Sequence, residues 1–266
     1  MKLPITQKQI YMINGKPIGL ALSGGAAKGF AHLGVLQAME EMSLKPDFIS
    51  GSSAGAIVAA FYSDGYKPYE ILKILSSYKL SDYMKPGWIK SGGLMKSIGL
   101  YKILSENLIT ENIENLSIPV WVCITNLNSG KAEYHNSGKL ARKVLASSSI
   151  PVFFRPVRLN NCIMVDGGVC DNLPVKPLVE QGCYIIAVNV NNIKQQNIKQ
   201  NIKSIAGRVF QLIVNKDLNE SVYKADLLIE PDLPDFGYLN LKNAEKYFNS
   251  GYNCAKKLFE NILSNI

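Results

Sequence analysis

The sequence predicts an α/β fold with a mostly parallel central sheet and helices on both faces. Short apolar runs of strand length alternate along the chain with longer segments of helical periodicity, as expected of parallel strands joined by helices. Hydrophobic residues make up 47% of the 266 residues, which suffices for a sizeable core without disulfides or metal ions. We expect one domain over residues 1–266, with its principal motifs between residues 18 and 190.

The first expected strand covers residues 16–22. The dipeptide Asn14-Gly15 is a strong turn signal and predicts that this strand forms a hairpin with residues 11–13. The first expected helix spans residues 29–42, where apolar residues recur at helical spacing. The same criteria predict further strands at 47–50, 118–126, 162–165 and 184–190, and further helices at 54–63, 67–78 and 139–147.

Two segments do not fit this alternation. Residues 81–99 combine glycines, lysines and large apolar side chains around Trp88, which is typical of an exposed excursion or lid. Residues 191–203 are nearly all Asn, Gln, Lys and Ile and predict a polar loop. The apolar and basic side chains from Tyr83 to Leu100 suggest reversible contact with an anionic membrane, although an ordinary packed loop has the same composition.

Charge and composition argue against several classes of protein. The formal net charge of +8 comes from scattered lysines and arginines, with no basic run and no nucleic-acid motif, so nucleic acid is not an expected partner. The five cysteines form no C-x-x-C pair and there are only two histidines, so no metal site is expected. No apolar segment has the length of a bilayer span or the pattern of a signal peptide. We expect a cytoplasmic protein without a cofactor that touches membranes only peripherally.

The segment Gly51-Ser52-Ser53-Ala54-Gly55 matches the pattern G-x-S-x-G between an expected strand and an expected helix. In this setting a sharp strand-to-helix turn exposes the serine hydroxyl, and Gly51 and Gly55 leave room for the turn. The helix N-terminus also favours negative charge that develops beside Ser53. Ser53 is therefore a candidate nucleophile, and a tight turn packed by small residues is the alternative.

A second glycine-rich turn, Ser23-Gly24-Gly25-Ala26-Ala27-Lys28-Gly29, also joins an expected strand to an expected helix. It has neither the Gly-Lys-Ser/Thr ending of a Walker loop nor the glycine spacing of the dinucleotide fingerprint. Its backbone N–H groups can instead cradle an anion, which makes Gly24, Gly25 and Ala26 candidate donors to an oxyanion. A close strand–helix contact that requires small residues is the alternative.

A nucleophilic serine needs a base, and neither histidine has the position expected of one. His32 is expected on a helix, and His135 in a strand that runs into a turn. Asp166 ends an apolar strand just before Gly167 and Gly168, where α/β sheets bind ligands. Asp166 is therefore the candidate base. A conventional triad with His135, and a simple Asp-Gly turn, remain alternatives.

The blocks at 23–29, 51–55 and 166–168, in this order, resemble the patatin-like phospholipase family. Residues 146–157, residues 225–231 and residues 244–251 are also similar to it, so the resemblance covers about residues 18–255. It implies the three-layer patatin architecture and a serine lipid acyl hydrolase with a Ser53–Asp166 dyad, an acyl-enzyme intermediate and no cofactor. A lipid-binding protein of the same fold without catalytic activity is the alternative.

The resemblance also implies roles for the glycine-rich loop. The N–H groups of Gly24, Gly25 and Ala26 hold the oxyanion, and Lys28 braces the loop or adds positive potential. The family loop usually has three consecutive glycines, so Ala26 departs from it, and a positive φ there would be strained. The acyl chain of the substrate is expected to lie along apolar side chains, for which the candidates are Phe30, Phe61, Ile150, Val152 and Phe153.

Overall fold

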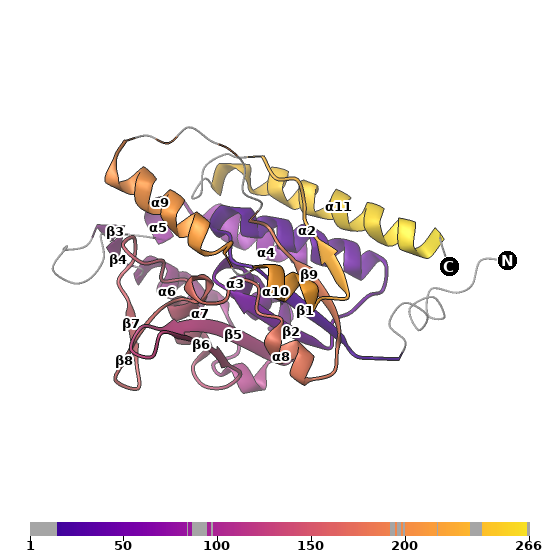
Figure 1. The fold of residues 1–266 in the computed structure, drawn as a ribbon, viewed down its shortest axis with the longest axis horizontal. Helices are drawn as coiled ribbons and strands as arrows, with labels where there is room; N and C mark the ends of the chain where they lie inside the picture. Colours follow the sequence, from indigo (N-terminus) through magenta and orange to yellow (C-terminus); the bar gives the residue numbers. More distant parts are fainter. Residues whose placement is uncertain are drawn as a thin grey trace.

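The computed structural model describes residues 15–264 apart from 84, 87–94, 97, 192–194, 196–197, 199, 217 and 235–240. Its centre is a sheet of eight strands in the order β10-β9-β1-β2-β5-β8-β7, with β6 also paired to β5 (Figure 1). The strands of this sheet are β1 (Ile18–Leu22), β2 (Phe48–Ser52), β5 (Val120–Asn126), β6 (Lys131–His135), β7 (Val157–Leu159), β8 (Cys162–Asp166), β9 (Tyr184–Val188) and β10 (Leu227–Ile229).

Helices follow most of the parallel strands. They are α2 (Phe30–Glu41), α3 (Ala54–Ser63), α4 (Pro68–Ser77), α5 (Leu80–Tyr83), α6 (Ile98–Asn107), α7 (Leu140–Ser147), α8 (Lys176–Glu180), α9 (Ile202–Ile213), α10 (Leu218–Tyr223) and α11 (Ala244–Ser264). Short 3₁₀ turns include η1 (Ala26–Gly29) and η4 (Gly167–Val169), and β3 (Lys85–Pro86) pairs with β4 (Met95–Lys96). None of the helices in the described ranges is both long and apolar enough to cross a bilayer.

The predicted α/β architecture is confirmed. Strands β10, β9, β1, β2 and β5 are parallel, and only β6, β7 and β8 pair in the antiparallel sense. Alternate residues of β1 face opposite sides of the sheet, as the pleat requires. Leu20 and Leu22 pack into the core that contains α2, α3 and α11, whereas Ala21 packs against Leu178 of α8 on the other side. In Figure 1, α11 lies alongside α2 on the first of these faces.

Two strands share one edge of β5, and this arrangement positions the site. Strand β6 occupies one edge of β5 along most of its length. On the other edge, β2 pairs with β5 as far as Cys123, and β8 pairs with it from Ile124 onward. Because β2 is parallel and β8 antiparallel to β5, the C-terminal ends of β2 and β8 meet. Ser53 follows β2 and Asp166 ends β8, so the two residues are brought together there.

The strands and helices expected from periodicity are confirmed within a few residues, but residues 19–22 of β1 pair in the parallel sense. There β1 has parallel neighbours on both edges, β2 on one side and β9 on the other. Residues 11–14 lie outside the described part of the chain. The predicted hairpin partner at residues 11–13 is among them.

Most of the expected excursion at 81–99, including Trp88, lies outside the described residues. Two of its described residues, Tyr83 and Met95, are half-buried. The Tyr83 hydroxyl donates a hydrogen bond of 2.5 Å to the carbonyl of Leu75, and Met95 N–H donates one of 2.9 Å to the carbonyl of Phe153. Six of the thirteen residues of the expected polar loop at 191–203 also lie outside the described part. Asn191 at its start is fully buried, and α9 begins at Ile202.

Candidate active site

Ser53 lies at a strained turn between β2 and α3. Its backbone has φ 51° and ψ −119°, a conformation that a residue with a side chain rarely adopts outside functional sites. The turn is possible because its two flanking glycines lie against backbone. A Cβ on Gly51 would come within 2.6 Å of the Gly55 carbonyl carbon, and one on Gly55 would overlap the carbonyl oxygen of Leu22. The turn therefore requires the glycines of the motif and places the Ser53 hydroxyl at the C-terminal edge of the sheet.

The Ser53 hydroxyl donates a hydrogen bond of 2.6 Å to Oδ2 of Asp166. The other carboxylate oxygen, Oδ1, accepts a 2.9 Å hydrogen bond from the N–H of Gly168, which fixes the orientation of the carboxylate. Asp166 is fully buried. Burial raises its pKa to about 7, although the hydrogen bonds from Ser53 and Gly168 act in the opposite direction. A carboxylate with this pKa is suited to accept a proton from a hydroxyl near neutral pH.

Two serines that sequence reasoning did not single out hold Ser53 and Asp166 in place. The Ser147 hydroxyl accepts a 2.9 Å hydrogen bond from Ser53 N–H and donates one of 2.6 Å to the carbonyl of Cys123. The carbonyl of Ser149 accepts a 3.0 Å hydrogen bond from Asp166 N–H. Both lie in the segment 146–157, whose resemblance to the family was the only sequence signal for them.

The glycine-rich loop lies directly against Ser53. A Cβ on Gly24 would approach the Ser53 Cβ to 3.0 Å, and one on Gly29 would meet Ala54 at 2.6 Å. Gly24 itself is not a spare donor, which corrects its expected role, because its N–H donates a 3.1 Å hydrogen bond to the carbonyl of Asn172. In the described part of the chain, the N–H groups of Gly25 and Ala26 donate no hydrogen bond.

Several buried polar side chains support this loop. The Asn191 side chain donates to the carbonyl of Gly24. His32 is fully buried, and its Nε2 lies 2.8 Å from the carbonyl of Ser23, to which it donates. Lys28 is buried in η1. These contacts hold the glycine-rich loop in place. The role of Asn191 could not be recognised from the sequence, because the segment that contains it is otherwise polar and repetitive.

An apolar cavity of about 120 Å³ opens next to Ser53. An apolar cavity of similar size stays dry and takes up a small apolar ligand. Of the residues expected to contact an acyl chain, Phe30 and Ile150 line this cavity. The other three do not. Phe61 is in the core and Val152 is half exposed. Phe153 packs against the cluster that contains Ile150 and Phe154 but does not line the cavity. The remaining apolar wall is formed by side chains that include Ile57, Val58, Leu75, Tyr83, Leu100 and Phe154.

The family model for patatin-like phospholipases matches residues 20–179, which contain Ser53, Asp166 and the glycine-rich loop. The chain belongs to the patatin-like phospholipase family. Lysophospholipase NTE1 of Candida glabrata is 31% identical over 218 residues, which is 77% of this chain and 12% of that protein. Lysophospholipase NTE1 of Cryptococcus neoformans is 32% identical over 206 residues, 73% of this chain and again 12% of that protein.

This patatin-like chain therefore corresponds to only about an eighth of the length of those relatives. A solved structure, VipD from Legionella pneumophila, has a similar fold with a TM-score of 0.53. The similarity covers 92% of this chain and 67% of that one, at 16% sequence identity. Within the described ranges, no three His, Cys, Asp or Glu side chains are grouped so that they could hold a metal ion.

The patatin-like loop of this chain carries alanine where the family usually has its third glycine, and the structure shows the expected strain. Ala26 has φ 47°, in the left-handed region. We expect Ala26→Gly to raise the free energy of unfolding by roughly 0.5–1 kcal/mol, because relief of the left-handed strain exceeds the added entropy of the unfolded chain. Denaturant melts would measure this gain. The neighbouring Ala27 has no positive φ and is buried, so Ala27→Gly should lose stability. Equal losses for both variants would contradict the argument.

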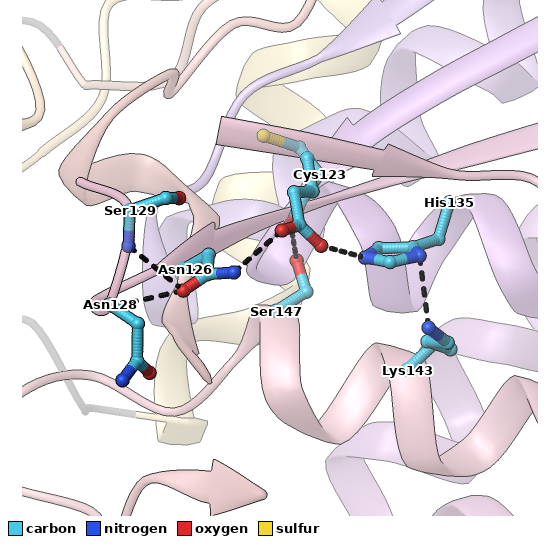
Figure 2. A network of polar contacts seen from close by, with 8 residues as sticks. Cys123, Asn126, Asn128, Ser129, His135, Lys143 and Ser147 are labelled. Carbon is cyan, nitrogen blue, oxygen red and sulfur yellow. Dashed lines mark hydrogen bonds and ion pairs between the residues drawn. The ribbon is translucent and has the colours of Figure 1, made fainter. Parts of the chain in front are cut away.

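Neither histidine of this patatin-like chain contacts Ser53 or Asp166. His135 lies 3.1 Å from Glu133 and 2.9 Å from Lys143, on the β6 edge of β5. Figure 2 shows His135 directed toward Lys143 of α7, while Ser147 of the same helix reaches the carbonyl of Cys123. Burial lowers the pKa of His32 to about 4, so its ring is neutral at pH 7. This geometry gives no support to the alternative triad with His135.

We accordingly expect His135→Gln to keep at least about half of the wild-type kcat/KM on a short p-nitrophenyl ester, since the contacts that are lost, to Glu133 and Lys143, do not involve Ser53 or Asp166. Steady-state kinetics, with circular dichroism as a check on folding, would measure this. A loss as deep as that of Ser53→Ala in a folded protein would restore the triad hypothesis.

Proposed function

We propose that this chain is a serine lipid acyl hydrolase that cleaves the carboxylic esters of lysophospholipids or phospholipids. The observation that carries the proposal is the 2.6 Å hydrogen bond between Ser53 and the buried Asp166 beside an apolar cavity. The names of the NTE1 relatives favour a lysophospholipid substrate. Phospholipase A and simple carboxylesterase activities are the nearest alternatives within this class.

In the proposed mechanism, Ser53 Oγ attacks the ester carbonyl carbon while its proton moves to Asp166 Oδ2. The tetrahedral oxyanion is held by backbone N–H groups, for which Gly25 and Ala26 are the candidates because Gly24 is engaged. Collapse of the intermediate expels the alcohol, which takes the proton from Asp166, and leaves the acyl group on Ser53. Water then attacks the acyl-enzyme, passes a proton to Asp166, and the fatty acid leaves as Ser53 recovers its proton.

Two measurements test this function. A fluorophosphonate probe should label the wild-type protein at Ser53 and should not label Ser53→Ala. The protein should release fatty acid from lysophosphatidylcholine at the same rate in EGTA as in calcium. A noncatalytic lipid-binding protein would bind the lipid but show neither labelling nor release, and that result would overturn the proposal.

The cavity gives a further prediction about chain length. Ile57 lines the cavity, so Ile57→Trp should fill part of it and lower kcat/KM for a long-chain ester by about tenfold, while a butyrate ester is hydrolysed nearly as well as before. Ile109 is an exposed isoleucine that does not line the cavity, so Ile109→Trp is the matched control. Equal losses on both esters would show that the chain does not bind there.

A further inference from the structure

Helix α9 presents an aliphatic face to solvent. Of the thirteen large apolar side chains that are exposed in the described part of the chain, four lie on this one helix of twelve residues. They are Ile205, Val209, Leu212 and Ile213, spaced so that they form one stripe along the helix. Lys216 is exposed one turn further on, at the end of the same stripe. A water-facing helix normally carries polar residues on this side, so the stripe suggests an interaction surface.

The opposite face of α9 packs against the candidate active site. Phe210 and Val214 form a buried cluster with Ile150 and Phe154, and the last two line the cavity next to Ser53. Val214 also lies close to Gly168, whose N–H binds Asp166. α9 is at the periphery of the molecule (Figure 1). A ligand on its outer face would therefore be only one helix away from the cavity.

The charge of α9 and of the residues beside it indicates which kind of partner binds the apolar stripe. Residues 202–216, which comprise α9 and the three residues after it, contain three basic residues and no acidic residue, within a chain of net charge +8. An amphipathic helix with an aliphatic face and nearby lysines and arginines is suited to the interface of an anionic bilayer. A second copy of the chain would bring two such basic surfaces together, which is unfavourable. We propose that the outer face of α9 docks this protein onto anionic phospholipid membranes. The docking proposal rests on the proposed function only in one respect, namely that docking would deliver lipid to the cavity.

Vesicle co-sedimentation tests the proposal without any need for hydrolysis. The protein would carry Ser53→Ala, so failure of the proposed catalytic function cannot affect the result. With vesicles of phosphatidylglycerol and phosphatidylcholine in equal parts, Val209→Glu should weaken binding by about tenfold or more, and salt should weaken binding of the parent protein. Val179→Glu is the matched control, because Val179 is a helical valine on α8 that is 45% exposed, against 49% for Val209.

Equal binding of both variants, or equal binding to pure phosphatidylcholine, would overturn the proposal. Size-exclusion chromatography gives a second outcome, since a parent dimer that becomes a monomer with Val209→Glu would assign the stripe to self-association instead. With Ser53 restored, Val209→Glu should hydrolyse a soluble p-nitrophenyl ester at the unchanged rate. A loss there would mean that α9 supports the site and is not the docking surface.

Discussion

Replacement of Asp166 by Asn, like replacement of Ser53 by Ala, should lower kcat/KM on p-nitrophenyl butyrate by about 10³-fold or more. The Asn side chain fills the same space but cannot accept the proton that Ser53 loses on attack. The hydrogen bond of 2.6 Å joins the two side chains as one unit, so their losses should not add. The double variant Ser53→Ala/Asp166→Asn should therefore be no less active than Ser53→Ala alone.

A conservative replacement of a nearby aspartate, Asp171, provides the control for this first prediction. Asp171 accepts a 2.6 Å hydrogen bond from the Tyr134 hydroxyl and has no hydrogen bond to Ser53, so Asp171→Asn should lose far less activity. An active Asp166→Asn enzyme would show that another group takes the proton. Additive losses in the double variant would mean that Ser53 and Asp166 act separately.

The second prediction with a large effect is the pH profile. Since burial raises the pKa of Asp166 to about 7, kcat/KM should rise about tenfold per pH unit below 7 and level off above it, so that activity at pH 5 is about 100-fold below the plateau. Asp166 is the only member of the proposed dyad that titrates in this range. A profile that is flat from pH 5 to pH 8 would contradict both the raised pKa and the role of Asp166 as the base.

Stability should change with pH in the opposite direction. The folded pKa of about 7 lies above the value near 3.9 of an unfolded chain, so the folded protein holds this proton more tightly. The contribution of Asp166 is fully present below about pH 4 and is lost as pH rises through about 7. Asp166→Asn keeps the site neutral, so it should melt at a higher temperature than wild type at pH 8 and at nearly the same temperature at pH 5. Equal melting temperatures at pH 8 would show that the ionised Asp166 carboxylate does not destabilise the folded protein.

The sequence by itself determined the class of fold and the two turns that carry the chemistry. Apolar periodicity is a local property, so the α3 helix at Ala54–Ser63 and the β8 strand at Cys162–Asp166 were predicted to within a residue. The requirement for Gly51 is also local, because a Cβ there would meet the backbone of Gly55 in the same turn, whereas Gly55 must fit against Leu22 of the adjacent strand β1. The later helices α9 and α11 were not predicted as such, although their apolar residues also recur at helical spacing.

Only the tertiary structure decided which residues meet. Ser53 and Asp166 are 113 positions apart, and they touch because β2 and β8 follow one another along a single edge of β5. The same long-range pairing gives the Gly24 N–H an acceptor in Asn172, which removed one expected oxyanion donor. It also places Phe154 in the cavity wall, while its neighbour Phe153 packs against the same cluster without lining the cavity. These contacts depend on which surfaces come together after the strands pair, and they cannot be predicted from the residues next to each position in the sequence.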